Sequence, residues 1–191
     1  MRRDFLLTAL VFLFLPGCED RPVDLDAAAL SAPLRQSATP ATDASVGALP
    51  IDGPWSTAEV DYEGHPMVVR RNDGYRKLGK IGGYEHQAAI AIRLNEPDAA
   101  GMPAAEEEKR LKDVESQVRA ALEDKAESLL VVVLTTVGTR ELVFYTRAPE
   151  DVRQRFEKLR SAIKGHEMQL MLQPDPDWVF YSQLSESRTG V

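Results

Sequence analysis

Between residues 88 and 172 the spacing of apolar side chains switches between two periods, and the order of the switches limits the folds open to this chain of 191 residues. Residues 88–94 alternate large apolar side chains with smaller or charged ones, which indicates a strand, whereas residues 104–125 place apolar side chains three and four apart, as on one face of a helix. A β-branched run at residues 129–136 predicts a strand buried on both faces, and residues 140–146 follow it after a turn at Val137 and Gly138. Pro149 begins a second helical pattern that ends at Gly165, and residues 168–172 predict a last strand.

The resulting order of strand, helix, strand, strand, helix and strand is that of the split βαβ, or ferredoxin-like, arrangement. Residues 55–71 precede it as a predicted β-hairpin that turns at Glu63 and Gly64. We therefore expect an α+β fold in which an antiparallel sheet carries two helices on one face and an extra N-terminal hairpin. The sequence does not show what covers the other face, and that coverage decides whether a binding groove exists there.

The first 18 residues have the three parts of a bacterial lipoprotein signal. Arg2 and Arg3 supply the positive charge, residues 5–15 are apolar but too short to span a bilayer, and Leu15-Pro16-Gly17 precedes Cys18. We expect removal of residues 1–17, attachment of lipid to Cys18, and anchoring in the cell envelope with the chain facing the periplasm or the exterior. The arginine pair also resembles a twin-arginine export motif, and ordinary export and the twin-arginine route both stay open. The choice between inner and outer membrane is open as well.

Residues 18–50 are rich in Ala, Pro, Ser, Thr and Asp and keep no period, so we expect a disordered tether. A flexible segment of this length typically reaches roughly 30 Å, which would let the folded domain stand off the membrane. We expect that domain at residues 51–185 and a disordered tail at residues 186–191.

Cys18 is the only cysteine, and the expected lipid uses its thiol, so the mature chain has no disulfide and no thiolate nucleophile. Its stability must then come from an apolar core. The chain has 23 Lys and Arg against 30 Asp and Glu, a formal charge of −7, which argues against a nucleic acid as partner.

Patterns that carry metal or catalytic chemistry are weak in this sequence. His65, His86 and His166 are too far apart in the chain to form a short ligand motif, so we expect neither a structural metal nor a cofactor. No G-x-S-x-G nucleophile motif occurs. The acidic run at residues 106–108 is best explained as a helix start, where acids complement the helix dipole.

The segment from Thr139 to Tyr145 is the most informative one. Along a strand, Glu141 and Tyr145 share one face, and Arg140 lies on the other. Glu141 and Tyr145 would form either a polar patch or a cross-strand ion pair with an aromatic plug, and Arg140 would serve a backbone or carboxylate partner. Near the chain end, Trp178 and Tyr181 would either lock that end onto the sheet or the first hairpin or, together with Arg140, line a binding patch. The candidate patch comprises Arg70, Arg140, Glu141, Tyr145, Trp178 and Tyr181.

Four motifs together resemble a bacterial domain-of-unknown-function family, number 695 in that series. They are Arg70-Arg71-Asn72, Gly101-Met102-Pro103, Gly138-x-Arg140-Glu141 with Phe144-Tyr145, and Asp175-Pro176-x-Trp178-x-x-Tyr181. The resemblance extends over about residues 55–184. It implies an α+β fold and brings no established activity, so no catalytic residue can be carried over from it.

Two hypotheses about function follow. The leading one is a membrane-anchored, non-catalytic envelope module that binds a protein, a peptide or a small ligand. The alternative is an envelope hydrolase whose carboxylates converge only in the fold. Two acids in a deep pocket would favour the hydrolase, and a shallow exposed patch would favour binding.

Overall fold

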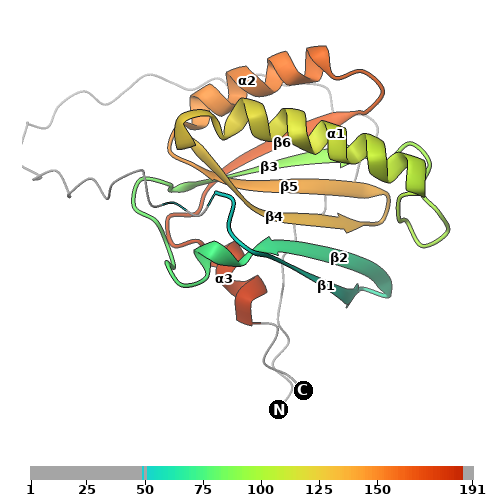
Figure 1. Ribbon diagram of the computed structural model, residues 1–191, viewed down its shortest axis with the longest axis horizontal. Coiled ribbons are helices and arrows are strands. Elements are labelled where there is room, and N and C mark those ends of the chain that lie inside the picture. The colour runs from blue at the N-terminus through green and yellow to red at the C-terminus, as the bar shows by residue number, and fades with distance from the viewer. Residues whose placement is uncertain (1–48, 50, 187–191) are drawn as a thin grey trace, which may run out of the picture. The chain divides into compact units, whose positions relative to one another are not determined.

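The computed structural model describes residues 49 and 51–186, which form an α+β fold with a six-stranded antiparallel sheet and three α-helices (Figure 1). The strands are β1 (Trp55–Tyr62), β2 (His65–Asn72), β3 (His86–Arg93), β4 (Ser128–Thr136), β5 (Thr139–Thr146) and β6 (Met168–Pro174). The helices are α1 (Ala105–Leu122), α2 (Pro149–Ala162) and α3 (Val179–Glu186), with 3-10 turns η2 (Asp73–Tyr75) and η3 (Asp124–Ala126). The predicted signal peptide, Cys18 and most of the predicted tether lie outside the described residues. Within the described residues, no helix is long and apolar enough to cross a membrane.

In space the strands follow the order β1-β2-β4-β5-β3-β6, with antiparallel neighbours throughout. The predicted hairpin is present, because β1 and β2 pair over all eight residues around Glu63 (φ +53°) and Gly64 (φ +83°). Positive φ at both turn residues gives the type I′ turn, whose twist matches that of the flanking strands. Val137 and Gly138 join β4 to β5, and both of these turn residues also have positive φ. β1 and β6 are therefore the two edges of the sheet.

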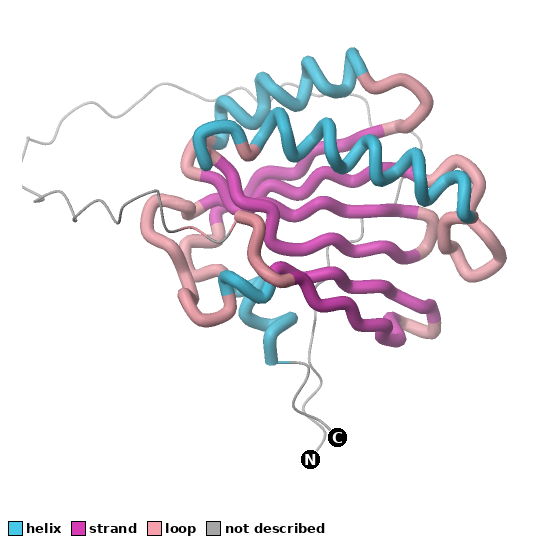
Figure 2. The backbone as a smooth tube through the Cα atoms, viewed as in Figure 1, coloured by secondary structure: helices cyan, strands magenta, loops and turns pink. Residues whose placement is uncertain are grey.

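The helices α1 and α2 lie side by side on one face of the sheet (Figures 1 and 2). The main core lies beneath them, and its members on α1 recur three and four residues apart: Leu111, Val114, Val118 and Leu122. Ile90 and Ile92 of β3 and Phe144 of β5 face this stripe from the sheet. Full burial of each such side chain contributes about 1.5–3 kcal/mol, so this layer holds the helices on the sheet.

A second core lies on the opposite face, in which the segment from η2 to Tyr84 and the helix α3 pack against one end of the sheet. Figure 2 shows these loops and α3 beside the strands, away from α1 and α2. The buried aromatic members of this core are Tyr75, Tyr84, Tyr145, Trp178 and Tyr181. The sequence does not show what covers the sheet face opposite α1 and α2. At this end of the sheet, aromatic side chains cover that face.

Two elements differ from the sequence-based prediction. The helical pattern extends to residue 125, but α1 ends at Leu122 because Lys125 (φ +53°) adopts a left-handed conformation that a helix cannot continue through. The sequence predicts no helix after residue 174, yet Asp175 accepts hydrogen bonds from the backbone N–H groups of Val179 and Phe180 at 2.9 and 3.2 Å and so caps α3.

Candidate functional site

The structure divides the six residues of the predicted binding patch between the two faces of the sheet. Arg70 and Arg140 lie on the helix face, where each contacts a glutamate of α1. The other four lie on the opposite face or pack against it: Glu141, Tyr145, Trp178 and Tyr181. The structure therefore does not bring the six residues together on one surface, because successive residues of a strand point to opposite faces.

Arg140 joins β5 to the first turns of α1. Its Nη2 donates to Glu108 Oε2 at 2.7 Å, and its Nε donates to Thr135 Oγ1 at 2.9 Å. The Arg140 side chain is only 5% exposed. A buried cation is stable only when it is paired, so Glu108 fixes Arg140 in a structural role. This is the carboxylate partner that the sequence offers as one interpretation of Arg140.

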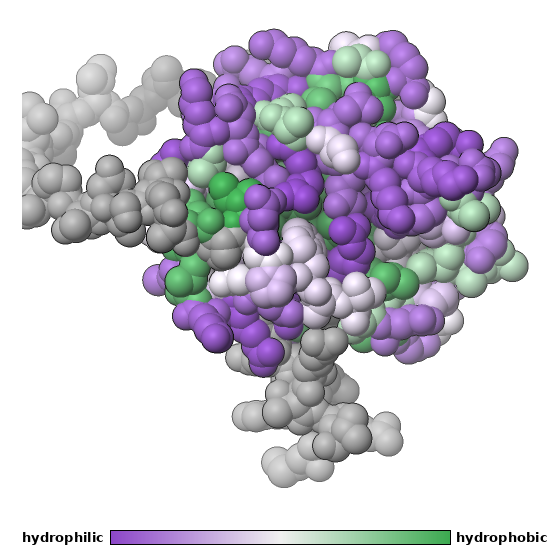
Figure 3. All heavy atoms as spheres, viewed as in Figure 1, coloured by the Kyte–Doolittle hydropathy of each residue, from purple (hydrophilic) through white to green (hydrophobic). Residues whose placement is uncertain are grey.

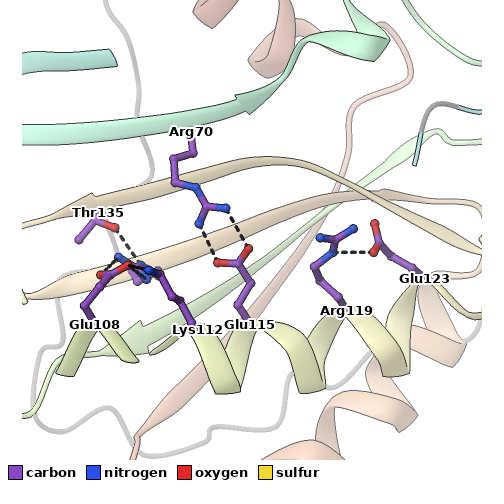
Figure 4. A network of polar contacts seen from close by, with 8 residues as sticks. Arg70, Glu108, Lys112, Glu115, Arg119, Glu123 and Thr135 are labelled. Carbon is purple, nitrogen blue, oxygen red and sulfur yellow. Dashed lines mark hydrogen bonds and ion pairs between the residues drawn. The ribbon is translucent and has the colours of Figure 1, made fainter. Parts of the chain in front are cut away.

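Arg70 joins β2 to the middle of α1. Its Nη1 and Nη2 donate to Glu115 Oε2 and Oε1 at 2.9 and 3.3 Å, and its guanidinium carbon lies 5.5 Å from the ring centre of Trp55 (Figure 4). The two-pronged geometry fixes both side chains more firmly than a single contact would. Arg70 keeps 33% of its side chain exposed, whereas the Glu115 side chain is 9% exposed.

Arg119 continues this row toward the end of α1. Its Nε donates to Glu123 Oε2 at 2.7 Å, and Glu123 Oε1 accepts the backbone N–H of Leu130 at 3.0 Å. We call the row the α1 seam, defined as Arg70, Glu108, Glu115, Arg119, Glu123 and Arg140. Three arginines face three glutamates in it, so the formal charges of the seam cancel. The seam attaches α1 to the sheet and leaves little free charge for a ligand.

Glu107 is fully buried at the start of α1. Its Oε1 accepts the backbone N–H of Asn95 at 3.0 Å and lies 3.1 Å from Nε2 of His166, and its Oε2 accepts Nη2 of Arg110 at 2.7 Å. Burial raises the pKa of Glu107, but the hydrogen bonds from Asn95, Arg110 and His166 outweigh it and hold the pKa below its ordinary value. The carboxylate is therefore ionised at neutral pH and links α1 to the loops after β3 and before β6.

We expect Glu107→Gln to lower the free energy of unfolding at neutral pH by about 1.5–3 kcal/mol, because hydrogen bonds to a buried charged group are lost. The pKa of Glu107 is lower in the folded chain than its ordinary value of 4.5, so the stabilisation by the ionised form is complete above that pH. It is lost as the pH falls through the lower, folded-state pKa. Urea unfolding of both proteins should therefore show a difference that shrinks as the pH is lowered from 7 toward 3.

The control for this prediction is Glu106→Gln, which changes the neighbouring glutamate. The Glu106 side chain is 73% exposed and forms an ion pair with Lys109 at 2.7 Å. Its replacement should change stability by no more than about 0.5 kcal/mol at any pH. A Glu107→Gln effect that stays constant over the whole pH range would contradict an ionised, buried carboxylate.

Trp178 is the centre of the aromatic core on the opposite face. It is 1% exposed and stacks on Tyr145 with ring centres 4.0 Å apart and planes 8° apart. Its indole N–H donates to the carbonyl of Tyr84 at 2.8 Å. Tyr145 O–H donates to Asp175 at 2.6 Å, and Tyr181 O–H donates to the carbonyl of Asn72 at 2.7 Å. These contacts anchor the chain end to the sheet and leave the indole no surface for a ligand.

Three buried tyrosines of this core donate hydrogen bonds: Tyr84, Tyr145 and Tyr181. Burial raises the pKa of Tyr145 far above its ordinary value, and the hydrogen bond to Asp175 raises it further. Burial likewise raises the pKa of Tyr181 to about 12. Phenols that stay protonated cannot serve as bases, so the cluster is suited to packing and orientation.

A shallow hollow of about 400 Å³ lies at the tip of the β1–β2 hairpin and is open to solvent. Its lining residues are Glu59, Val60, Asp61, Gly64 and Pro66. Glu59 and Asp61 are two residues apart on β1 and both are exposed. Catalytic carboxylate pairs usually converge in a deep, enclosed pocket, whereas these two side chains lie on an open surface. The hollow is therefore better suited to docking than to chemistry.

The three histidines do not come together. His166 contacts Glu107, whereas His65 and His86 begin the strands β2 and β3. Across residues 49 and 51–186, no group of three or more His, Cys, Asp or Glu side chains is arranged to hold a metal ion.

Sequence reasoning missed the inward-facing carboxylates of α1. The acidic run at residues 106–108 does begin the helix, but Glu107 lies four residues before Leu111 and therefore continues the buried stripe. Glu108 and Glu115 are seven residues apart, which places both on the side of α1 that faces the sheet. An acidic residue on the buried stripe of a helix indicates that its carboxylate has a buried partner. Which residue is that partner depends on the fold.

Residues 54–185 match the model of a family described as Family of unknown function (DUF695), which agrees with the range of the resemblance. Neither the curated proteins nor the solved structures include a match. The motifs that carry the resemblance make structural contacts: Gly101 lies against the Val137–Gly138 turn, Arg140 binds Glu108, and Trp178 stacks on Tyr145. In this chain the motifs therefore describe how the fold is held together.

Proposed function

This chain belongs to the family of unknown function DUF695, and we propose that it is a lipid-anchored protein of the bacterial envelope whose folded domain is a non-catalytic interaction module. One observation carries this proposal: the inward-facing acids Glu107, Glu108 and Glu115 are all held by arginine or by other donors. A carboxylate in acid–base chemistry has to reach the substrate. Acids that fasten α1 to the sheet and to its neighbouring loops contribute to the fold instead.

The lipid anchor is supported by the sequence Leu15-Pro16-Gly17-Cys18 after an apolar stretch. Residues 19–48 separate Cys18 from the first described residue, Leu49. An unpatterned segment of that length reaches roughly 30 Å, so the domain meets partners close to the membrane.

We expect Cys18→Ala to abolish lipid attachment, because no other cysteine can accept the lipid. The variant should lose label from a metabolically supplied fatty acid and leave the membrane fraction, or accumulate unprocessed. Ser31→Ala, a comparably small change downstream of Cys18, serves as the control and should keep both label and membrane association. Fatty-acid label on the Cys18→Ala chain would refute the anchor.

We also propose that β3 to β6 with α1 and α2 adopt the ferredoxin-like split βαβ topology. Support comes from the chain order β3-α1-β4-β5-α2-β6, the spatial order β4-β5-β3-β6 and the placement of both helices on one face (Figure 1). Because this fold hosts many unrelated functions, the proposal of an interaction module depends on the surface and not on the fold.

The surface of the β1–β2 hairpin supports docking. It carries the open hollow, and in Figure 3 the surface over the hairpin is mixed in hydropathy. Interfaces between proteins commonly combine apolar and polar surface in this way.

To test this proposal, envelopes that contain the tagged, full-length chain are solubilised in a mild detergent. The sedimentation of the tagged chain is then measured. An interaction module is expected to sediment in a complex of fixed composition that light cross-linking preserves. The same chain, purified alone in that detergent, provides the size of the unbound species. Sedimentation of the envelope-derived chain at that smaller size would contradict the proposal.

A further inference from the structure

β1 is the outermost strand, and in the part of the chain that the structure describes no other strand pairs with its second edge (Figure 1). Such an edge presents backbone N–H and C=O groups that can pair with another strand. Natural proteins often protect edges with a proline, a bulge, a very short strand or charged side chains. β1 has eight residues in continuous register with β2 and no proline, so charge at Glu59 and Asp61 is its protection against chance pairing, whereas the opposite edge strand β6 ends in Pro174.

The hairpin geometry determines which backbone groups point to the free edge. In a hairpin with a two-residue turn, the pair next to the turn, Tyr62 and His65, exchanges hydrogen bonds, and bonded and non-bonded pairs then alternate. Asp61 lies opposite Pro66, which has no N–H to donate, in agreement with this alternation. The backbone groups of Glu59 and Asp61 therefore point away from β2 and toward the free edge.

The side chains along this edge have a definite chemistry. Glu59 and Asp61 lie on one face of β1, and Val60, which is 39% exposed, lies on the other. β1 contains no lysine or arginine. Among the described residues neither carboxylate forms an ion pair, although Asp61 accepts the N–H of Gly64 at 3.1 Å. At Glu59 and Asp61 the edge thus combines outward-pointing backbone groups with two exposed carboxylates.

We propose that the free edge of β1 binds an extended basic segment of a partner protein by adding it as a further strand. The segment carries Lys or Arg at alternate positions beside Glu59 and Asp61, with apolar residues between them beside Val60. This inference rests on the proposed interaction function and names its surface and partner chemistry. A second copy of this chain fits the edge poorly, because its own β1 brings acids against acids.

The test measures fluorescence anisotropy of a labelled peptide that alternates lysine and valine, titrated with the full-length chain in detergent. The basic peptide is expected to bind, and a peptide with glutamate in place of lysine is not. Glu59→Lys should weaken binding by at least about tenfold, which corresponds to about 1.4 kcal/mol. Glu85→Lys, the same charge change at an exposed residue before β3, should alter it by no more than about twofold. Equal melting temperatures of the two variants establish that both are folded.

A third peptide separates strand pairing from charge attraction, because N-methyl groups on alternate amides remove the N–H donors but keep the lysines. Its binding is expected to be lost. Equal binding of the methylated and parent peptides would overturn strand addition, and so would an unchanged affinity of Glu59→Lys. A dimer of this chain that Glu59→Lys alters would assign the edge to a second copy and overturn the basic partner. If the peptide test fails while the envelope complex is found, only the assignment to β1 falls; absence of the complex refutes the proposed function itself.

Discussion

Replacing Trp178 with alanine is expected to lower the free energy of unfolding by about 3–5 kcal/mol. The indole is 1% exposed, stacks on Tyr145 and makes edge contacts with Tyr75 and Tyr181 at 6.0 and 5.9 Å. Alanine would remove this packing, leave a cavity, and leave the carbonyl of Tyr84 without the indole donor. Urea and thermal unfolding of the full-length chain measure the loss.

Two variants make the Trp178 result specific. Val179→Ala changes the next residue, which is 50% exposed, and should cost no more than about 0.5 kcal/mol. Trp178→Phe keeps an aromatic ring but loses the N–H donor, so its loss should fall between those of Val179→Ala and Trp178→Ala. An unchanged melting temperature of Trp178→Ala would reject the anchor and make Trp178 the first residue to probe for ligand contact.

Gly101→Ala is expected to cost about 2–5 kcal/mol, from a left-handed backbone at about 1–2 kcal/mol and overpacking at about 1–3 kcal/mol. Gly101 has φ +79°, and an added Cβ would lie 2.8 Å from Cα of Val137 and 3.0 Å from N of Gly138. These are backbone atoms of the β4–β5 turn, so neither can rotate away. The N–H of Gly138 also donates to the carbonyl of Gly101 at 2.8 Å, and a shift would weaken that bond.

Gly83→Ala is the matched control for Gly101→Ala. Gly83 has φ +87°, but an added Cβ there meets no atom within 4 Å. It should therefore show the backbone cost alone, about 1–2 kcal/mol. The difference between the two variants, measured by urea unfolding, isolates the contact between Gly101 and the β4–β5 turn. Equal losses would mean that the turn moves aside and that the contact contributes little.

Local periodicity accounts for the elements that the sequence predicts. The stripe from Leu111 to Leu122 and the β-branched run of β4 each specify an element from residues close together in the chain. The helix α3 escapes prediction because it is short and its start depends on Asp175, whose carboxylate also accepts the O–H of Tyr145 from a distant strand. Because the residue that caps α3 is held in place by a distant strand, the spacing of apolar residues in the sequence does not reveal where this helix begins.

The contacts of the candidate site could be predicted only in part. Alternation along β5 shows that Arg140 and Glu141 point to opposite faces, but it does not show which element lies over each face. Arg70 and Glu115 are 45 residues apart in the chain, and their pairing depends on where α1 crosses the sheet. The sequence therefore indicates that these residues have partners, and only the fold identifies them.

The central claim, that the anchored domain binds a partner through its hairpin, is tested most directly by site-specific photo-cross-linking in intact cells. A photoreactive residue replaces either Val60 on β1 or Val179 on α3, two exposed valines at 39% and 50% exposure. The account predicts one discrete adduct from position 60, competed by the lysine–valine peptide added to isolated envelopes, and none from position 179. Equal adducts from both positions, or none from position 60 while the chain is lipidated and folded, would contradict it.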